Sequence, residues 1–331
     1  MLTSLHIQNF KGFKDTLIPE LRKVNLIVGG QNVGKTSLLE AVVFVAGDVH
    51  GSSTPGARSS LSSMFRPCEG DGDARRFWRS LVGEERKPVS VGVHARIDDV
   101  SYVSCGYVPV GFEQKLNGRL ATHVDGLGRV DWFCGSEDPN KPYPSGGQIP
   151  QPFSMLPKPA QEQVELYGRL VTGKKKKIVL KLLQKIEPRI DSVDAVAPDG
   201  EHRVYVDLTD GHVLPISQLG HGFTRLFELY AGLAVTESKL ALIDEIENGI
   251  HYSALPTLLQ GVRELAEANG VQSIITTHSL ECIKSAYEVF QDKQEDFQLI
   301  RLERTDDGNV RAVVIHDENL KTVMESGWEI R

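Results

Sequence analysis

The chain of 331 residues has few cysteines, and they are not spaced as metal ligands or as a disulfide framework. No two of them form a CxxC pair, and no histidine stands at the spacing of a zinc ligand. Disulfide-rich secreted scaffolds and structural zinc sites are therefore excluded as explanations of the fold. The four cysteines are Cys68, Cys105, Cys134 and Cys282.

Long apolar runs are also missing, since no segment approaches the length of about 18 residues that a membrane helix needs. The sequence begins without a signal-peptide pattern, so we expect a cytoplasmic protein with no membrane partner. Basic charge is not in excess, because the formal net charge is −7 and the pI is about 5.8. Nonspecific phosphate binding is therefore not the dominant property, although a basic groove for nucleic acid stays open.

The composition, 40% apolar and 24% charged, is that of a soluble globular protein with a buried core. Near the N-terminus the sequence alternates as "LHIQNF" and then gives the apolar run "VNLIV". A glycine-rich turn and the helical pattern "TSLLEAVVFVAG", ending at Gly47, follow. The first fifty residues therefore predict two strands, a loop and a helix.

Residues 51–202 differ from both flanks. The segments "VSVGVHARI", "VSYVSCGYV" and "GRVDWFC" predict short antiparallel strands, and residues 139–160 hold many prolines. The segment "KKKKIVLKLLQKI" predicts a helix whose lysines form a solvated face rather than a phosphate track. We interpret 51–202 as an insertion or lid.

From "RVYVDL" at 203–208 onward, apolar strands alternate with helices. The pattern predicts helices at 222–236, 253–268 and 279–290, and strands at 240–243 and 272–276. Such alternation is typical of a mostly parallel sheet flanked by helices. We therefore expect one α/β domain over 1–331, with a discontinuous core of 1–50 plus 203–331 and an antiparallel β and helical insertion.

The segment "GGQNVGKT" at 29–36 fits the phosphate-binding pattern GxxxxGK[ST], and it follows a strand and opens a helix. In such a loop, glycines let the backbone approach phosphates, Lys35 neutralises β- and γ-oxygens, and the Thr36 hydroxyl ligates Mg²⁺. ATP and Mg²⁺ are the predicted cofactors. The predicted nucleotide-binding residues are Gly29, Gly30, Gln31, Asn32, Val33, Gly34, Lys35, Thr36 and Ser37.

Two neighbouring acids close the apolar run in "LALIDEIENGIH" at 240–251. Successive side chains of a strand point to opposite faces, so Asp244 and Glu245 do not share one task. In a P-loop nucleotidase the first acid holds Mg²⁺ together with the loop hydroxyl. Asp244 takes that role, and Glu245 is free to orient and deprotonate the attacking water.

A third apolar strand, "SIITTHS" at 273–279, is expected to end in His278. The order of P-loop, "LGHGF" at 219–223, "LALIDE" and "TTH" resembles the head of ABC-type ATPases, including the RecF/SMC-like and OLD families. The resemblance covers about 1–50 and 203–290. It implies a P-loop NTPase fold of the ABC head type and an ATPase activity.

The resemblance also implies roles for individual residues. "LGHGF" stands where the family has its LSGGQ signature, so Gly222 matches an invariant glycine that faces the γ-phosphate of a partner head. Gly220 replaces the family's serine there, and His278 matches the switch histidine that contacts the γ-phosphate. "NGIH" falls where the D-loop lies, with His251 in place of an aspartate. Candidates for the Q-loop glutamine are Gln148 and Gln151.

The stretches "IDEIENGIHYS", "THSLECI" and "GWEIR" are most similar to stand-alone OLD-like ATPases of bacterial phage-defence systems. Too few residues follow His278 for the Toprim nuclease domain of OLD proteins, and "RTDDGN" at 304–309 predicts a hairpin turn. The resemblance therefore implies an ATPase without a nuclease of its own.

Two functions follow from the resemblance. In the first, a homodimer or higher oligomer closes around shared ATP and controls an effector supplied in trans, such as a Toprim- or HNH-like nuclease, in antiviral defence. In the second, a DNA repair or DNA-structuring ATPase of the RecF/SMC type clamps nucleic acid. No long heptad region joins the two halves, which excludes a coiled coil of SMC length.

Overall fold

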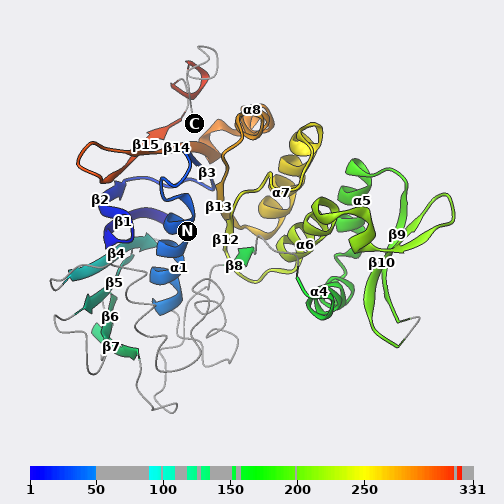
Figure 1. The fold of residues 1–331 in the computed structure, drawn as a ribbon, viewed down its shortest axis with the longest axis horizontal. Helices are drawn as coiled ribbons and strands as arrows, with labels where there is room; N and C mark the ends of the chain where they lie inside the picture. Colours follow the sequence, from blue (N-terminus) through cyan, green and yellow to red (C-terminus); the bar gives the residue numbers. More distant parts are fainter. Residues whose placement is uncertain are drawn as a thin grey trace. The chain divides into compact units, whose positions relative to one another are not determined.

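The computed structural model describes residues 1–49, 89–97, 100–108, 118–124, 128–134, 151–153, 158–197, 200–316 and 319–322. The chain divides into two compact units. The first consists of Met1–Pro150 and Glu295–Arg331, and the second of Gln151–Gln294. Figure 1 shows the elements of both units.

The first unit contains an antiparallel sheet with the strand order β2-β1-β4-β5-β6-β7. Alternation in β1 buries Leu5 and Ile7, and Leu5 pairs with Ile18 of β2. The expected strands after residue 88 join β1 in this sheet, with Ile7 opposite Val93. The strands are β1 (Leu2–Phe10), β2 (Phe13–Ile18), β4 (Val89–Ile97), β5 (Val100–Val108), β6 (Gly118–Val124) and β7 (Gly128–Cys134).

The same unit carries the phosphate-loop pattern between β3 (Val24–Gly29) and α1 (Lys35–Val49). β14 (Phe297–Arg304) runs parallel to the fully buried β3 and antiparallel to β15 (Val310–Ile315). The predicted hairpin turn at 304–309 is confirmed, because Thr305 N–H donates to the Asn309 carbonyl at 2.9 Å and Gly308 has a φ of 76°.

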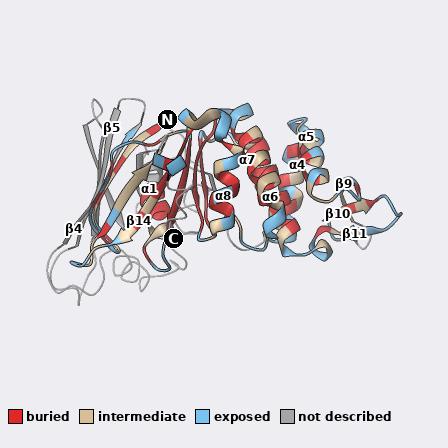
Figure 2. Ribbon diagram, turned by 90° about the horizontal axis from the view of Figure 1, so that it is seen from above, coloured by how far each residue is buried: buried red, intermediate tan, exposed pale blue. Residues whose placement is uncertain are grey.

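The second unit contains parallel strands in the order β13-β12-β8, with Ala241 of β12 opposite both Ser273 and Gln151. Its larger helices pack through apolar faces, and Figure 2 colours most of α6 as buried. The elements are β8 (Gln151–Phe153), α6 (His221–Val235), β12 (Leu240–Ile243), η2 (Tyr252–Ala254), α7 (Leu255–Asn269), β13 (Gln272–Thr276), α8 (Leu280–Val289) and η3 (Gln291–Asp296), which leads out of the unit.

A smaller antiparallel sheet, β11-β10-β9, completes the second unit. Two helices pack on it, as Figure 1 shows in green. Their packing includes Tyr167, whose hydroxyl donates to Asp194 at 2.8 Å. The elements are α4 (Ala160–Thr172), α5 (Lys176–Ile186), β9 (Ile190–Val196), β10 (Arg203–Leu208), β11 (Val213–Pro215) and η1 (Ile216–Leu219).

The expected α/β architecture, with parallel strands flanked by helices and additional antiparallel strands, is confirmed. The segment 51–202 contributes described elements to both compact units. The prediction that it acts as one insertion on a core of 1–50 plus 203–331 stays a prediction. Within the described residues, no helix combines the length and the apolar character needed to span a membrane.

Candidate active site

The predicted phosphate loop joins β3 to α1 through three residues with positive φ. These are Gly29 at 144°, Asn32 at 58° and Gly34 at 111°. A Cβ on Gly29 would lie 2.5 Å from the Leu302 carbonyl oxygen, and one on Gly34 would lie 3.2 Å from the Phe13 ring. A side chain at either position would therefore have a strained backbone conformation and would crowd a neighbouring group.

Lys35 folds back over this loop. Its Nζ donates to the Gly29 carbonyl at 2.8 Å and to the Gly30 carbonyl at 2.9 Å. Arg304 adds a second cation, because its guanidinium donates to the Asn32 carbonyl at 3.2 Å. Backbone N–H groups at a helix N-terminus together with such cations favour an anion. The exposed loop residues are Gly30, Gln31, Asn32 and Thr36.

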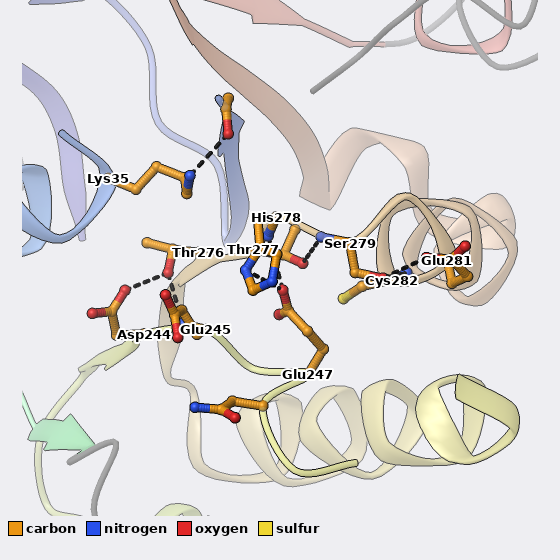
Figure 3. Close-up of polar contacts among 12 residues, drawn as sticks. Lys35, Asp244, Glu245, Glu247, Thr276, Thr277, His278, Ser279, Glu281 and Cys282 are labelled. Carbon is orange, nitrogen blue, oxygen red and sulfur yellow. Dashed lines mark hydrogen bonds and ion pairs between the residues drawn. The ribbon is translucent and has the colours of Figure 1, made fainter. Parts of the chain in front are cut away.

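The neighbouring acids follow β12 in the second unit, and one threonine of β13 contacts both of them (Figure 3). Thr276 Oγ1 donates to Asp244 Oδ1 at 2.5 Å and accepts the Glu245 N–H at 2.8 Å. Glu245 has a φ of 44°, which is uncommon for a residue with a side chain. Among the described residues, its carboxylate forms no hydrogen bond or ion pair, whereas Asp244 is only 7% exposed. The two acids therefore have different environments.

Arg225 of α6 holds the backbone of this acidic segment. Its Nη2 donates to the carbonyls of Asp244 at 2.6 Å and Glu245 at 2.7 Å, and its Nη1 lies 3.4 Å from the Asn248 carbonyl. Burial lowers the pKa of this guanidinium, which remains charged at any physiological pH. Sequence reasoning missed Arg225, because one arginine in a helical pattern carries no signal of its long-range partner.

The signature-like segment opens α6. Gly220 has a φ of 97° and directly precedes the helix. A Cβ on Gly222 would lie 1.9 Å from the Gly249 carbonyl oxygen. The segment "LGHGF" therefore packs against "NGIH". This contact is possible because Gly222 has no side chain.

His278 follows β13 and lies beside a third carboxylate, that of Glu247 (Figure 3). Its backbone N–H donates to Glu247 Oε1 at 2.8 Å, and its Nδ1 lies 3.0 Å from the same oxygen. His251 contacts a different group, since its Nδ1 is 2.8 Å from Ser253 Oγ. Sequence reasoning assigned no role to Glu247.

The remaining predicted residues divide between the two units. Thr36 belongs to the first and Asp244 to the second, and their joint ligation of Mg²⁺ stays a prediction. Of the Q-loop candidates, Gln148 lies outside the described residues and Gln151 begins β8. Within the described ranges, His, Cys, Asp and Glu do not gather in groups of three as a metal cage. Mg²⁺ in phosphate sites needs only one or two carboxylates, because it keeps several waters.

Two family models match separate parts of the chain. Residues 1–57 match the model described as "AAA ATPase domain". Residues 150–283 match the model described as "AAA domain, putative AbiEii toxin, Type IV TA system". The first match includes the phosphate loop, and the second includes the neighbouring acids and His278.

Similarity to known proteins extends over nearly the whole chain. An "ATP/GTP phosphatase" of Helicobacter pylori (strain ATCC 700392 / 26695) is 21% identical, with 98% of each chain covered. Among solved structures, the SmcHead bound to the C-winged helix domain of ScpA has a TM-score of 0.59 at 15% identity, covering 97% of this chain and 99% of that chain.

The Smc head domain from Pyrococcus furiosus, with an extended coiled coil and bound to the C-terminal domain of ScpA, has a TM-score of 0.58 at 15% identity. That alignment covers 98% of both chains. These likenesses confirm the predicted fold, an SMC head-like P-loop ATPase fold. The family models and the relative confirm the predicted enzyme class, an ATPase.

Proposed function

We propose that the protein hydrolyses ATP with the triphosphate on the loop of residues 29–36 and with Mg²⁺ held by Thr36 and Asp244. Lys35 leaves the carbonyls of its own loop and neutralises the β- and γ-phosphate oxygens. The support for this step is a loop with positive φ at Gly29, Asn32 and Gly34 that leads into the N-terminus of α1 and carries the Lys35 ammonium at its own carbonyls.

In the second half of the proposal, Glu245 deprotonates the attacking water and His278 contacts the γ-phosphate. The observation that carries it is the pair of contacts made by Thr276, which holds Asp244 by its carboxylate and Glu245 by its backbone. One acid is thereby immobilised for a metal, while the carboxylate of the next is left for a proton transfer.

Replacing each acid by its amide tests this division of labour. Glu245→Gln keeps the size of the side chain but does not take a proton at neutral pH, so turnover should fall by at least about 10²-fold. ATP and Mg²⁺ should still bind. Asp244→Asn removes a metal ligand and should weaken Mg²⁺-dependent nucleotide binding itself. Binding and steady-state hydrolysis are measured with both ATP and GTP.

Assembly separates the two variants further. With hydrolysis stalled, Glu245→Gln should accumulate a nucleotide-bound dimer or larger assembly, seen by light scattering with ATP and Mg²⁺. Glu237→Gln is the matched control, because Glu237 is exposed and precedes β12 at its other end. If the two amide variants behave alike, or if Glu245→Gln assembles no more than wild type, the proposed roles are wrong.

The biological role that we propose is an ATP-dependent switch. Two heads close around shared nucleotide, each supplying its Gly222 segment, and the closed state controls an effector protein in trans. A nuclease in antiviral defence is the proposed effector. One support is the description of the matched model, which names a toxin of a type IV TA system. Purification of the native complex tests this role by identifying what accompanies the protein.

A clamp on nucleic acid is the competing role. It predicts that ATP increases affinity for DNA, and that this affinity falls steeply with salt because phosphate contacts release counterions. The effector role predicts ATP-dependent assembly with no such gain in DNA affinity. Titration of labelled duplex DNA at several salt concentrations, with and without ATP, decides between them.

A further inference from the structure

The Glu247 side chain is largely shielded from solvent and lies beside an exposed histidine. It is 9% exposed, whereas the His278 side chain is 61% exposed. Both contacts with His278, one to the backbone N–H and one to Nδ1, are made by Oε1. Within the part of the chain that the structure describes, the other oxygen, Oε2, is buried without a hydrogen-bond partner.

Burial of a carboxylate is unfavourable unless hydrogen bonds or opposite charges offset it. A hydrogen bond to the His278 backbone alone would be met equally well by a neutral amide or hydroxyl acceptor. Beyond that hydrogen bond, the negative charge of Glu247 lies closest to the imidazole, whose Nδ1 is 3.0 Å away. The position of the Glu247 carboxylate beside Nδ1 therefore indicates that it controls the orientation and protonation of the His278 ring.

We propose that Glu247 is a positioning residue for His278, an inference that rests on the proposed hydrolysis of ATP. The carboxylate keeps a proton on Nδ1 and fixes the ring plane, so that Nε2 is the atom left for an oxygen of the γ-phosphate. Its charge also offsets the positive charge that the ring carries when both nitrogens are protonated and Nε2–H donates to phosphate.

The location of Glu247 supports this role. It lies in the same segment as Asp244 and Glu245, whose carbonyls Arg225 holds. The charge of Glu247 also acts on Arg225 and opposes the effect of burial on the pKa of that guanidinium. The segment after β12 thus carries three acids with three tasks: metal ligation, proton transfer and orientation of the histidine.

The first test is direct observation of the ring in the full-length protein without nucleotide. Imidazole nitrogen NMR reports which nitrogen of His278 carries the proton, and the signal is assigned by its loss in His278→Gln. We expect the Nδ1–H form in wild type. In Glu247→Gln, which still accepts the backbone N–H, we expect a shift toward the Nε2–H form. An unchanged tautomer overturns the proposal.

The second test is the coupling between the two residues. Glu247→Gln should lower kcat by about 10-fold or more with little change in KM. Losses of this size are typical when a residue that orients a functional histidine is replaced. In a His278→Gln background the same change should alter kcat less than about twofold, because the ring it orients is gone. Equal losses in both backgrounds would show a structural role.

Controls separate this inference from the proposed function. Glu281→Gln is the matched variant, since Glu281 accepts a hydrogen bond from Ser279 Oγ at 2.8 Å near the same strand end. It should leave kcat and the His278 tautomer unchanged. If wild type hydrolyses neither ATP nor GTP, the proposed function fails by itself, and the tautomer measurement alone then decides whether Glu247 positions the ring.

Discussion

Helices α1 and α6, each of 15 residues, both begin after a glycine with positive φ, but the two beginnings are built differently. The φ is 111° at Gly34 and 97° at Gly220. A Cβ on Gly34 would crowd the Phe13 ring at 3.2 Å, whereas a Cβ on Gly220 would meet no atom within 4 Å. At α6 the crowded position is Gly222, inside the first turn.

This difference separates two uses of glycine. At α1 the glycines allow the positive φ angles and the close contacts with Leu302 and Phe13, and this loop is the one that we propose binds phosphate. At α6 the missing side chain admits the Gly249 carbonyl, so Gly222 serves the packing of the helix against the acidic segment. The phosphate-loop pattern at α1 and the family resemblance at α6 both assign the helix start to phosphate contact.

The largest effect is expected at the loop before α1. Lys35→Ala should abolish hydrolysis mainly through lost phosphate binding, because Lys35 is the loop's own mobile cation. Lys23→Ala is the matched control, since Lys23 precedes β3 at the end away from the loop and its Nζ lies 2.9 Å from an oxygen of Asp296. Nucleotide affinity is measured by titration. Wild-type affinity in Lys35→Ala would refute the role given to this lysine.

A smaller effect should distinguish the two glycines of α6. Gly222→Ala places a Cβ against backbone and should lower the free energy of unfolding by about 3 kcal/mol, as overpacking does. Gly220→Ala strains only its own backbone and should cost about 1 kcal/mol. Denaturant unfolding of both variants measures the difference. An equal or reversed order would show that the segment at Gly249 moves aside freely.

The contact between Gly222 and the Gly249 carbonyl also affects how a larger substitution at Gly222 must be tested. From the sequence, Gly222→Glu should spare nucleotide binding and block closure of two heads, because a charged side chain would face phosphate. The structure adds a clash of its Cβ with Gly249, so the variant should also lose stability. Its turnover is therefore informative only alongside an unfolding measurement.

Local patterns predicted much of the fold. Alternation in "LHIQNF", the apolar run "VNLIV" and the turn residues at 304–309 each specify structure within a few neighbours, and these elements are present. β8 was missed because Pro152 reads as a strand breaker, and its pairing with β12 is a long-range contact. α4 was missed because the prolines before residue 160 masked its start.

The candidate site likewise contains residues that the sequence predicted and residues that only the structure shows. Motif spacing is enough to find Lys35 and the acid pair, because the chemistry needs fixed neighbours in the sequence. Thr276, Arg225 and Glu247 contact residues that are 19 to 32 positions away, through backbone carbonyls, backbone N–H groups, a carboxylate and a ring nitrogen. Such partners are selected by the folded geometry, and no spacing rule reports them.

The smallest expected effect concerns the buried glutamate that each helix carries. In α1, Glu40 is 8% exposed and pairs with Lys11. In α6, Glu228 is 5% exposed and accepts hydrogen bonds from the Lys158 N–H at 2.7 Å and the Gln163 amide at 3.1 Å. Burial raises the pKa of Glu228 above its ordinary value, and the hydrogen bonds only partly oppose it.

This raised pKa gives Glu228 a defined contribution to stability. Between the ordinary and the raised pKa, the folded state still binds a proton that the unfolded state has released, so stability from this group is lost as pH rises through that window. Glu228→Gln removes this loss and should gain stability relative to wild type as pH rises. Glu40→Gln, which breaks an ion pair, should instead be less stable than wild type at neutral pH. Urea unfolding across pH 5 to 8 gives the free energy of unfolding of each variant relative to wild type. If this difference stays flat or falls with pH for Glu228→Gln, the account of its burial is contradicted.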